Sequence, residues 1–126
     1  MLALAPVHPT LPAADLERAR RFYEEVVGFR PTEVLPGGVM YGAGDGTRFL
    51  VFPSSGRASG DHTQIGFTVS DLAAEVAELK SRGVTFESYA MPSFDPATSI
   101  ATIGATCSAW FKDSEGNLVG LVQFVD

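Results

Sequence analysis

Cysteine, histidine and positive charge are all scarce in this chain of 126 residues. Because Cys107 is the only cysteine, the chain can form neither an internal disulfide nor a metal site built from several cysteines. Nine Lys and Arg against fifteen Asp and Glu give a formal net charge of −6. This acidity argues against nucleic acid or an anionic membrane surface as the main partner. It favours a neutral or cationic small molecule, unless the charge serves solubility alone.

The opening residues, MLALAPVHPT, lack the features of a targeting segment. They contain no basic stretch and no long apolar run, so we expect no signal peptide, no membrane span and a cytoplasmic location. The chain does have the material for a core, with 45% hydrophobic and 19% charged residues. Its length suits a single domain.

The first half of the chain predicts a strand, a helix and three further strands. The strand VHPTL lies among prolines, which lack a backbone N–H, so it should lie at a sheet edge. Asp15 has the position of a helix N-cap, and Gly28 that of the residue ending the helix. The turn signals PGG and GDG separate three short strands, near residues 33–35, 39–41 and 48–52.

The second half predicts the same elements in the same order. Residues 63–69 alternate between apolar and polar side chains, which is typical of a half-buried strand. Asp71 caps a helix that Gly83 ends, and residues 84–89 form a strand. The segment AWFKDSEGNLVGLVQ is typical of a hairpin around DSEGN.

The two halves therefore form an internal repeat. His8 lies seven residues before Asp15, and Gln64 lies seven before Asp71. We expect an α+β domain of two βαβββ modules, about residues 5–56 and 61–126, with an inserted loop at about 91–105. Neither module can bury its sheet face alone, so two curved antiparallel sheets should enclose a cleft, with the helices outside.

Three segments resemble the vicinal oxygen chelate superfamily: LPAADLERARRFYEEVVGF, TQIGFTVSDLAAEVAELKSRGVTFE and AWFKDSEGNLVGLVQ. That superfamily contains glyoxalase I, extradiol dioxygenases, fosfomycin-resistance enzymes and bleomycin-binding proteins. The resemblance covers essentially the whole chain and implies its fold. It does not imply one function, because a common fold supports many chemistries.

The resemblance also implies where a metal would be held, since metal-dependent members use four side chains from the sheets. His8 and Gln64 occupy two of the corresponding positions in this sequence, and Leu50 and Gly120 occupy the other two. Leucine and glycine supply no donor atom, and a catalytic divalent ion needs about three protein ligands. We therefore expect no catalytic metal and no cofactor.

Counting residues through the hairpin turns predicts which side chains face each other. Trp110 should lie opposite Gly120, leaving space in front of a flat aromatic wall, and Met40 should lie opposite Leu50. The expected inner face is mostly apolar with a few polar groups, which is typical of a small-molecule pocket, although a plain core would use similar residues. The predicted pocket residues are His8, Thr10, Met40, Leu50, Phe52, Gln64, Gly66, Thr68, Trp110 and Gly120.

Other polar residues have simpler interpretations. His62 should be exposed in the loop RASGDH, and Cys107 should be an inert thiol. Glu87 and Tyr89 could supply an acid and a phenol, but a rim charge and an amphipathic side chain fit them better. The 91–105 insertion is either a lid over the cleft, a surface excursion or a dimer contact.

Two functions remain open. The first is a homodimer, as the resemblance implies, that binds a small aromatic or hydrophobic molecule in an apolar cleft without a catalytic metal. The second is a glyoxalase-like lyase, isomerase or dioxygenase-type enzyme that uses His8 as a general base, with or without a divalent metal. The lack of a metal-binding side chain at Leu50 and Gly120 favours the first function. The presence of both His8 and Gln64 at the other two positions favours the second. Neither needs nucleic acid or a membrane as partner.

Overall fold

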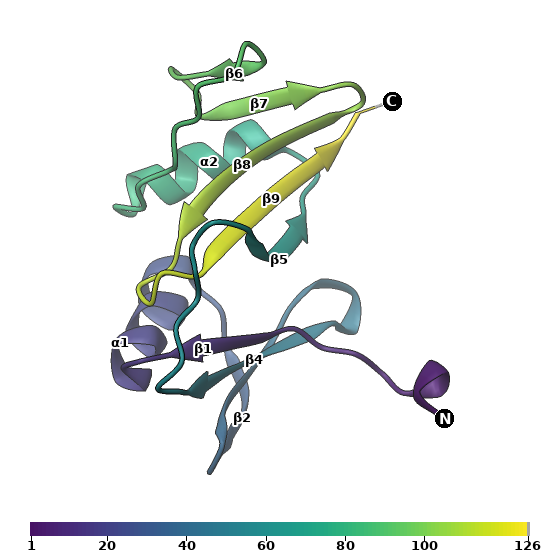
Figure 1. The fold of residues 1–126 in the computed structure, drawn as a ribbon, viewed down its shortest axis with the longest axis vertical. Coiled ribbons are helices and arrows are strands. Elements are labelled where there is room, and N and C mark those ends of the chain that lie inside the picture. The colour runs from purple at the N-terminus through teal and green to yellow at the C-terminus, as the bar shows by residue number, and fades with distance from the viewer. Residues whose placement is uncertain (126) are drawn as a thin grey trace. The chain divides into compact units, whose positions relative to one another are not determined.

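The computed structural model describes residues 1–125 and divides into two compact units, Met1–Arg57 and Ala58–Asp126. Each unit combines helix with one sheet, so the predicted α+β class is confirmed (Figure 1). The helices within residues 1–125 are all too short or too polar to cross a membrane.

The first unit has a four-stranded sheet in the order β1-β4-β3-β2. Its strands are β1 (Thr10–Ala13), β2 (Pro31–Leu35), β3 (Gly38–Gly42) and β4 (Arg48–Pro53). Its helical segments are η1 (Leu2–Leu4), α1 (Leu16–Arg21), the π-helix η2 (Phe22–Val27) and η3 (Gly44–Gly46).

β1 lies at an edge of this sheet, as its prolines predicted. It pairs only with β4, and the pairing is parallel. The helix between β1 and β2 carries the chain back, and two hairpins then leave β4 running in the direction of β1. The sheets are therefore antiparallel except where the first strand of each unit pairs with the last, since β5 and β9 also pair in parallel.

The helix of the first unit begins and ends where the sequence predicted. The Asp15 carboxylate accepts a hydrogen bond from the backbone N–H of Arg18 at 3.1 Å, which caps α1. Gly28 ends η2 with a φ of 100°, a left-handed conformation that glycine adopts without strain. The helix carries Tyr23 onto Tyr41 and Phe49, with ring centroids 5.8 and 5.5 Å apart, to form the core of this unit.

The second unit has a five-stranded sheet in the order β5-β9-β8-β7-β6 and one helix. The elements are β5 (Thr63–Thr68), α2 (Leu72–Ser81), β6 (Phe94–Asp95), β7 (Ile100–Ile103), β8 (Thr106–Lys112) and β9 (Leu118–Phe124).

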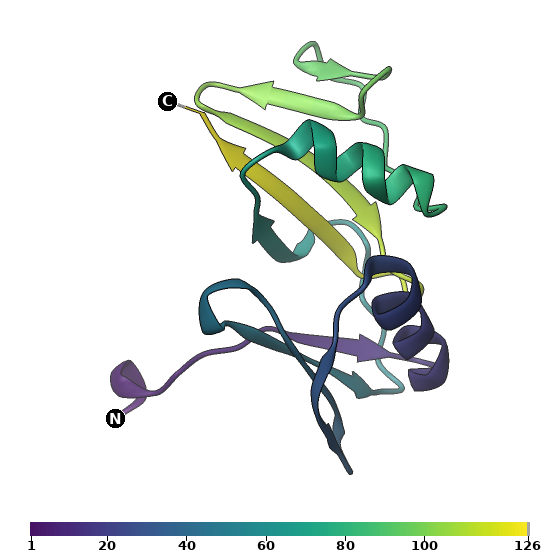
Figure 2. The same cartoon turned by 180° about the vertical axis from the view of Figure 1, so that it is seen from behind.

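α2 packs across one face of β8 and β9 (Figure 2). Asp71 caps it by accepting a hydrogen bond from the Ala74 backbone N–H at 3.1 Å, as predicted. The side chains that alternate toward the helix are buried, among them Phe111 and Val119. Trp110 and Gly120 therefore lie on the opposite face of the sheet.

The predicted register of the β8–β9 hairpin is confirmed. Trp110 pairs with Gly120, Phe111 with Val119 and Lys112 with Leu118. Asp113 closes the connecting turn, because its carboxylate accepts hydrogen bonds from the backbone N–H groups of Glu115 and Asn117. This local turn chemistry sets the register of both strands.

Two predictions in this unit were wrong. Residues 84–89 do not form a strand: Phe86 makes one isolated bridge with Phe111, and the Glu87 N–H donates to the Trp110 carbonyl at 2.8 Å. The 91–105 insertion is not a loop, because it contains β6 and β7. A tight turn at Gly104, with a φ of 58°, folds β7 back onto Thr106–Ser108 of β8. β7 thus takes the backbone partners along half of β8 and leaves only a short stretch for residues 86–87.

Candidate functional site

A cavity of about 200 Å³ opens on the second unit, on the sheet face that α2 leaves uncovered. Its walls come from the loop before β5, from the segment after α2 and from the β8–β9 hairpin. The lining residues are Asp61, His62, Thr63, Tyr89, Met91, Trp110 and Leu118.

Gly120 makes room for the Trp110 indole. A Cβ atom at position 120 would lie 3.2 Å from Trp110 Nε1 and 3.0 Å from Thr63 Cγ2, closer than ordinary packing allows. One edge of the indole therefore lies over Gly120 itself, and the cavity opens beside the ring rather than above this glycine. The absent side chain lets the indole lie down along the sheet.

Thr63 holds that indole in place. Trp110 Nε1 donates a hydrogen bond to Thr63 Oγ1 at 3.1 Å. Thr63 reaches this position because the β5–β9 register shifts between Thr63 and Ile65, so that Thr63 pairs with Leu118 and Ile65 with Val119. The shift leaves Gln64 out of the pairing.

Tyr89 forms the second aromatic wall. Its ring stands nearly perpendicular to the indole, with centroids 5.2 Å apart and planes at 81°, and it meets Phe94 in a similar way. Burial raises the pKa of the Tyr89 phenol, and the Glu87 carboxylate raises it further. The phenol therefore stays protonated and can donate a hydrogen bond at neutral pH.

The loop before β5 closes one side of the cavity. Its turn is held by Ser59, whose Oγ accepts from the Asp61 backbone N–H at 3.1 Å and lies 3.0 Å from His62 Nδ1. Gly60 has a φ of 74°, and a Cβ there would lie 3.2 Å from Lys112 Cε and 3.3 Å from the Gly116 carbonyl oxygen. Glycine at this position lets the loop approach the hairpin, which brings Asp61 and His62 to the cavity.

The residues predicted for the pocket fall in both units. Thr10 pairs with Leu50, and Met40 pairs with the same Leu50 as predicted, so these three share one face of the first sheet. Phe52 pairs with Pro12 next to them. Tyr41 and Phe49 alternate with these residues along β3 and β4 and face the helix. Thr10, Met40 and Leu50 therefore lie on the face of the first sheet that is turned away from the helix. His8 is exposed and precedes β1.

In the second unit, Gly66 pairs with Gly120, and Thr68 with Val122. Both Gly66 and Thr68 are exposed. Of the predicted residues, only Trp110 lines the cavity. Asp61, Thr63, Met91 and Leu118 escaped the sequence reasoning, and His62 was assigned only to an exposed loop. The sequence signal was weak: RASGDHT and SYAM carry no motif.

The residues at the superfamily's metal positions do not fit a metal ion. Leu50 and Gly120 have no side-chain donor atom, which leaves His8 and Gln64. Within residues 1–125, no group of three or more His, Cys, Asp or Glu is placed to hold a metal.

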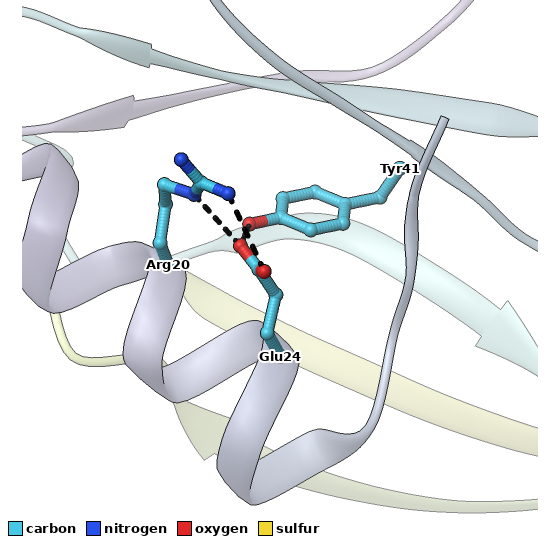
Figure 3. A network of polar contacts seen from close by, with 3 residues as sticks. All are labelled: Arg20, Glu24 and Tyr41. Atoms are coloured by element: carbon cyan, nitrogen blue, oxygen red, sulfur yellow. Dashed lines mark hydrogen bonds and ion pairs between the residues drawn. The ribbon is translucent and has the colours of Figure 1, made fainter. Parts of the chain in front are cut away.

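A part-buried polar network lies in the first unit (Figure 3). Glu24 accepts hydrogen bonds from Arg20 Nε and from the Tyr41 hydroxyl, both at 2.8 Å. The hydrogen bond from Arg20, followed by that from Tyr41, keeps the Glu24 pKa below its usual range despite partial burial. Burial, and then the Glu24 carboxylate, raise the Tyr41 pKa well above its usual value. The network ties helix to sheet, so we interpret it as structural.

The comparisons with known proteins agree with this fold. Residues 5–121 match the family model described as the Glyoxalase/Bleomycin resistance protein/Dioxygenase superfamily. A comparison with curated proteins gave no significant match.

Solved structures similar to the chain cover nearly all of it. TnmS3, an antibiotic binding protein from Streptomyces sp. CB03234, is 25% identical, with a TM-score of 0.72 over 96% of this chain and 98% of that one. UcmS2 is 20% identical, with a TM-score of 0.75 over 94% and 97%. A glyoxalase/bleomycin resistance protein/dioxygenase from Alicyclobacillus acidocaldarius is 19% identical, with a TM-score of 0.73 over 98% and 93%.

Proposed function

Because the chain belongs to the glyoxalase/bleomycin resistance protein/dioxygenase superfamily, we propose that it binds a small aromatic or hydrophobic molecule without a catalytic metal. One observation carries the proposal: Trp110 and Tyr89 form a corner at the edge of a 200 Å³ cavity. Two aromatic walls with a few polar groups between them are the usual composition of a binding site for an organic ligand. The antibiotic-binding description of TnmS3 supports the same class of function.

The polar groups at the cavity suit recognition of a ligand rather than chemistry on it. The Tyr89 phenol can donate one hydrogen bond, and the Thr63 hydroxyl is already engaged by the indole. His8, the general base of the alternative enzyme, is exposed outside the strand and does not line this cavity. The absence of donor atoms at Leu50 and Gly120 supports the metal-free form of the proposal.

Isothermal titration calorimetry tests the proposal by measuring the binding of quinoline, a neutral aromatic probe, to the protein. We expect saturable binding by the whole chain, and Trp110→Ala should weaken it at least about tenfold, since the largest wall is removed. Phe124→Ala is the matched control, because Phe124 is a 64% exposed aromatic residue of the same sheet outside the cavity. Equal loss of affinity in both variants, or an affinity that Trp110→Ala leaves unchanged, would refute the proposal.

We also propose that the chain is a homodimer, as its family resemblance implies. The outer edge of β1 supports this, because β1 has one neighbour in its sheet and its remaining backbone groups can pair with a second copy. Analytical ultracentrifugation at micromolar concentration should give twice the 13.4 kDa chain mass. A monomeric mass would contradict this part of the proposal.

A further inference from the structure

We infer that the Trp110–Tyr89 cavity selects flat aromatic cations over neutral aromatic molecules of the same shape. The inference rests on the proposed function, because it assigns a ligand class to the same cavity. It starts from the two rings. Their planes meet at 81°, so a flat ring that stacks on one of them presents its edge to the other. The electron-rich face of an indole or a phenol attracts a cation, and tryptophan does so most strongly.

An acidic residue lines the same cavity as these rings. Asp61 is the one acidic residue among the cavity's lining residues. Ser59 engages the backbone of Asp61 and the ring of His62, so the turn is fixed without using the carboxylate. Among residues 1–125, the Asp61 side chain accepts no hydrogen bond and forms no ion pair. Its charge therefore acts on whatever enters the cavity.

The other charges near the cavity do not cancel this one. Glu87 acts on the Tyr89 phenol, as the raised pKa of Tyr89 records, and adds negative charge on that side. Lys112 Nζ lies 3.8 Å from Glu87 Oε1, and its positive charge offsets the charge of that carboxylate. The formal charges of the acidic and basic side chains around the cavity, Asp61, Glu87 and Lys112, sum to one negative charge. A cation gains from both this charge and the aromatic faces.

The test compares quinoline with N-methylquinolinium, which share a flat ring system and differ in charge. Calorimetry at low salt and about pH 8, which keeps imidazole charge out of the comparison, should show the cation binding about threefold to tenfold more tightly. Asp61→Asn should lower that ratio by about twofold to fivefold, because an exposed charge contributes modestly. Added salt should lower the wild-type ratio in the same direction.

Glu75→Gln is the matched control. It removes the same charge from an exposed position on α2, which covers the other face of the sheet, and it should leave the ratio unchanged. Equal affinities for the two probes would overturn the inference and leave the proposed function standing. A ratio that Asp61→Asn and Glu75→Gln change equally would overturn it too, because total charge would then explain the preference. Failure of both probes to bind would overturn the proposed function itself.

Discussion

The two units share one framework and both bury aromatic rings, but the second also carries two rings on the sheet face away from its helix, where a cavity lies. In the first unit, Tyr23, Tyr41 and Phe49 gather on the sheet face that meets the helix and are almost fully buried. In the second, Trp110 and Tyr89 meet on the face away from the helix and stay half-buried. Rings on the helix side build a core, and rings on the far side leave a cavity.

The length of the chain between helix and hairpin produces this difference. In the first unit, only two residues separate Gly28, which ends the helix, from Pro31, where β2 begins. In the second, about ten residues separate Gly83 from β6, and they pass across the end of β8. That passage places Tyr89 against Trp110 and brings Met91 to the cavity. The repeat thus supplies the sheet, and the added segment supplies a wall of the site.

The largest expected effect separates the buried rings from the cavity rings. Tyr23→Ala should lower the free energy of unfolding by about 3–5 kcal/mol, because it empties the aromatic core of the first unit. Trp110→Ala should lower the free energy of unfolding by less than half of that, since the indole is half-buried, yet it should weaken quinoline binding at least about tenfold. Urea denaturation followed by circular dichroism measures both variants. If the two variants were destabilised equally, Trp110 would belong to a packed core rather than to the wall of an open cavity.

The next largest effect concerns pH and the polar network of the first unit. The Glu24 pKa is lower in the folded protein than in the unfolded chain. Ionised Glu24 therefore stabilises the fold at pH values above its unfolded pKa of about 4.3, and this stabilisation is lost as the pH falls through the folded pKa. Glu24→Gln should cost about 1–2 kcal/mol at neutral pH and flatten the acid side of the stability profile. Glu25→Gln changes an exposed neighbouring residue, so it should neither lower the stability at neutral pH nor flatten the acid side of the profile.

Tyr41 acts at the alkaline side of the same profile. The Tyr41 pKa is higher in the folded protein than in the unfolded chain. The protonated phenol therefore stabilises the fold fully at pH values below its unfolded pKa of about 10, and this stabilisation is lost as the pH rises toward the folded pKa. Tyr41→Phe should flatten that alkaline side. Thermal unfolding across pH measures both variants, and a profile that neither changes would contradict a structural role for the network.

A smaller effect tests the close approach at Gly120. Gly120→Ala should destabilise the second unit by about 1 kcal/mol, because the new methyl group pushes against Trp110 and Thr63. It should also shift the fluorescence of Trp110, the single tryptophan. Gly66 pairs with Gly120 across the sheet, but a Cβ there meets nothing within 4 Å, so Gly66→Ala should have no such cost. The two alanines should therefore differ in both measurements.

The smallest effect tests the hydrogen bond that holds the indole. Thr63→Val keeps the shape of the side chain and removes the acceptor, so it should cost about 0.5–1.5 kcal/mol and change the Trp110 emission maximum. Thr63→Ser keeps the hydroxyl and should restore the wild-type emission. If serine and valine behaved alike, the hydrogen bond would not be what positions the ring.

Local chemistry let the sequence determine much of the framework. Asp15 and Asp71 cap their helices, and the turn at Asp113 sets Trp110 opposite Gly120; each of these depends on residues close in the chain. The α+β class followed from their repeated order.

Only the tertiary structure decided which residues surround the cavity. The register shift that brings Thr63 to Trp110 depends on how β5 meets β9, which lies more than fifty residues away in the chain. Tyr89 reaches the indole because β7 takes the rest of β8's edge, and Asp61 reaches the cavity because Gly60 lets its loop approach the hairpin. Competition between distant segments for the same backbone partners leaves no periodic signal in a sequence, so these positions could be assigned only after the chain had folded.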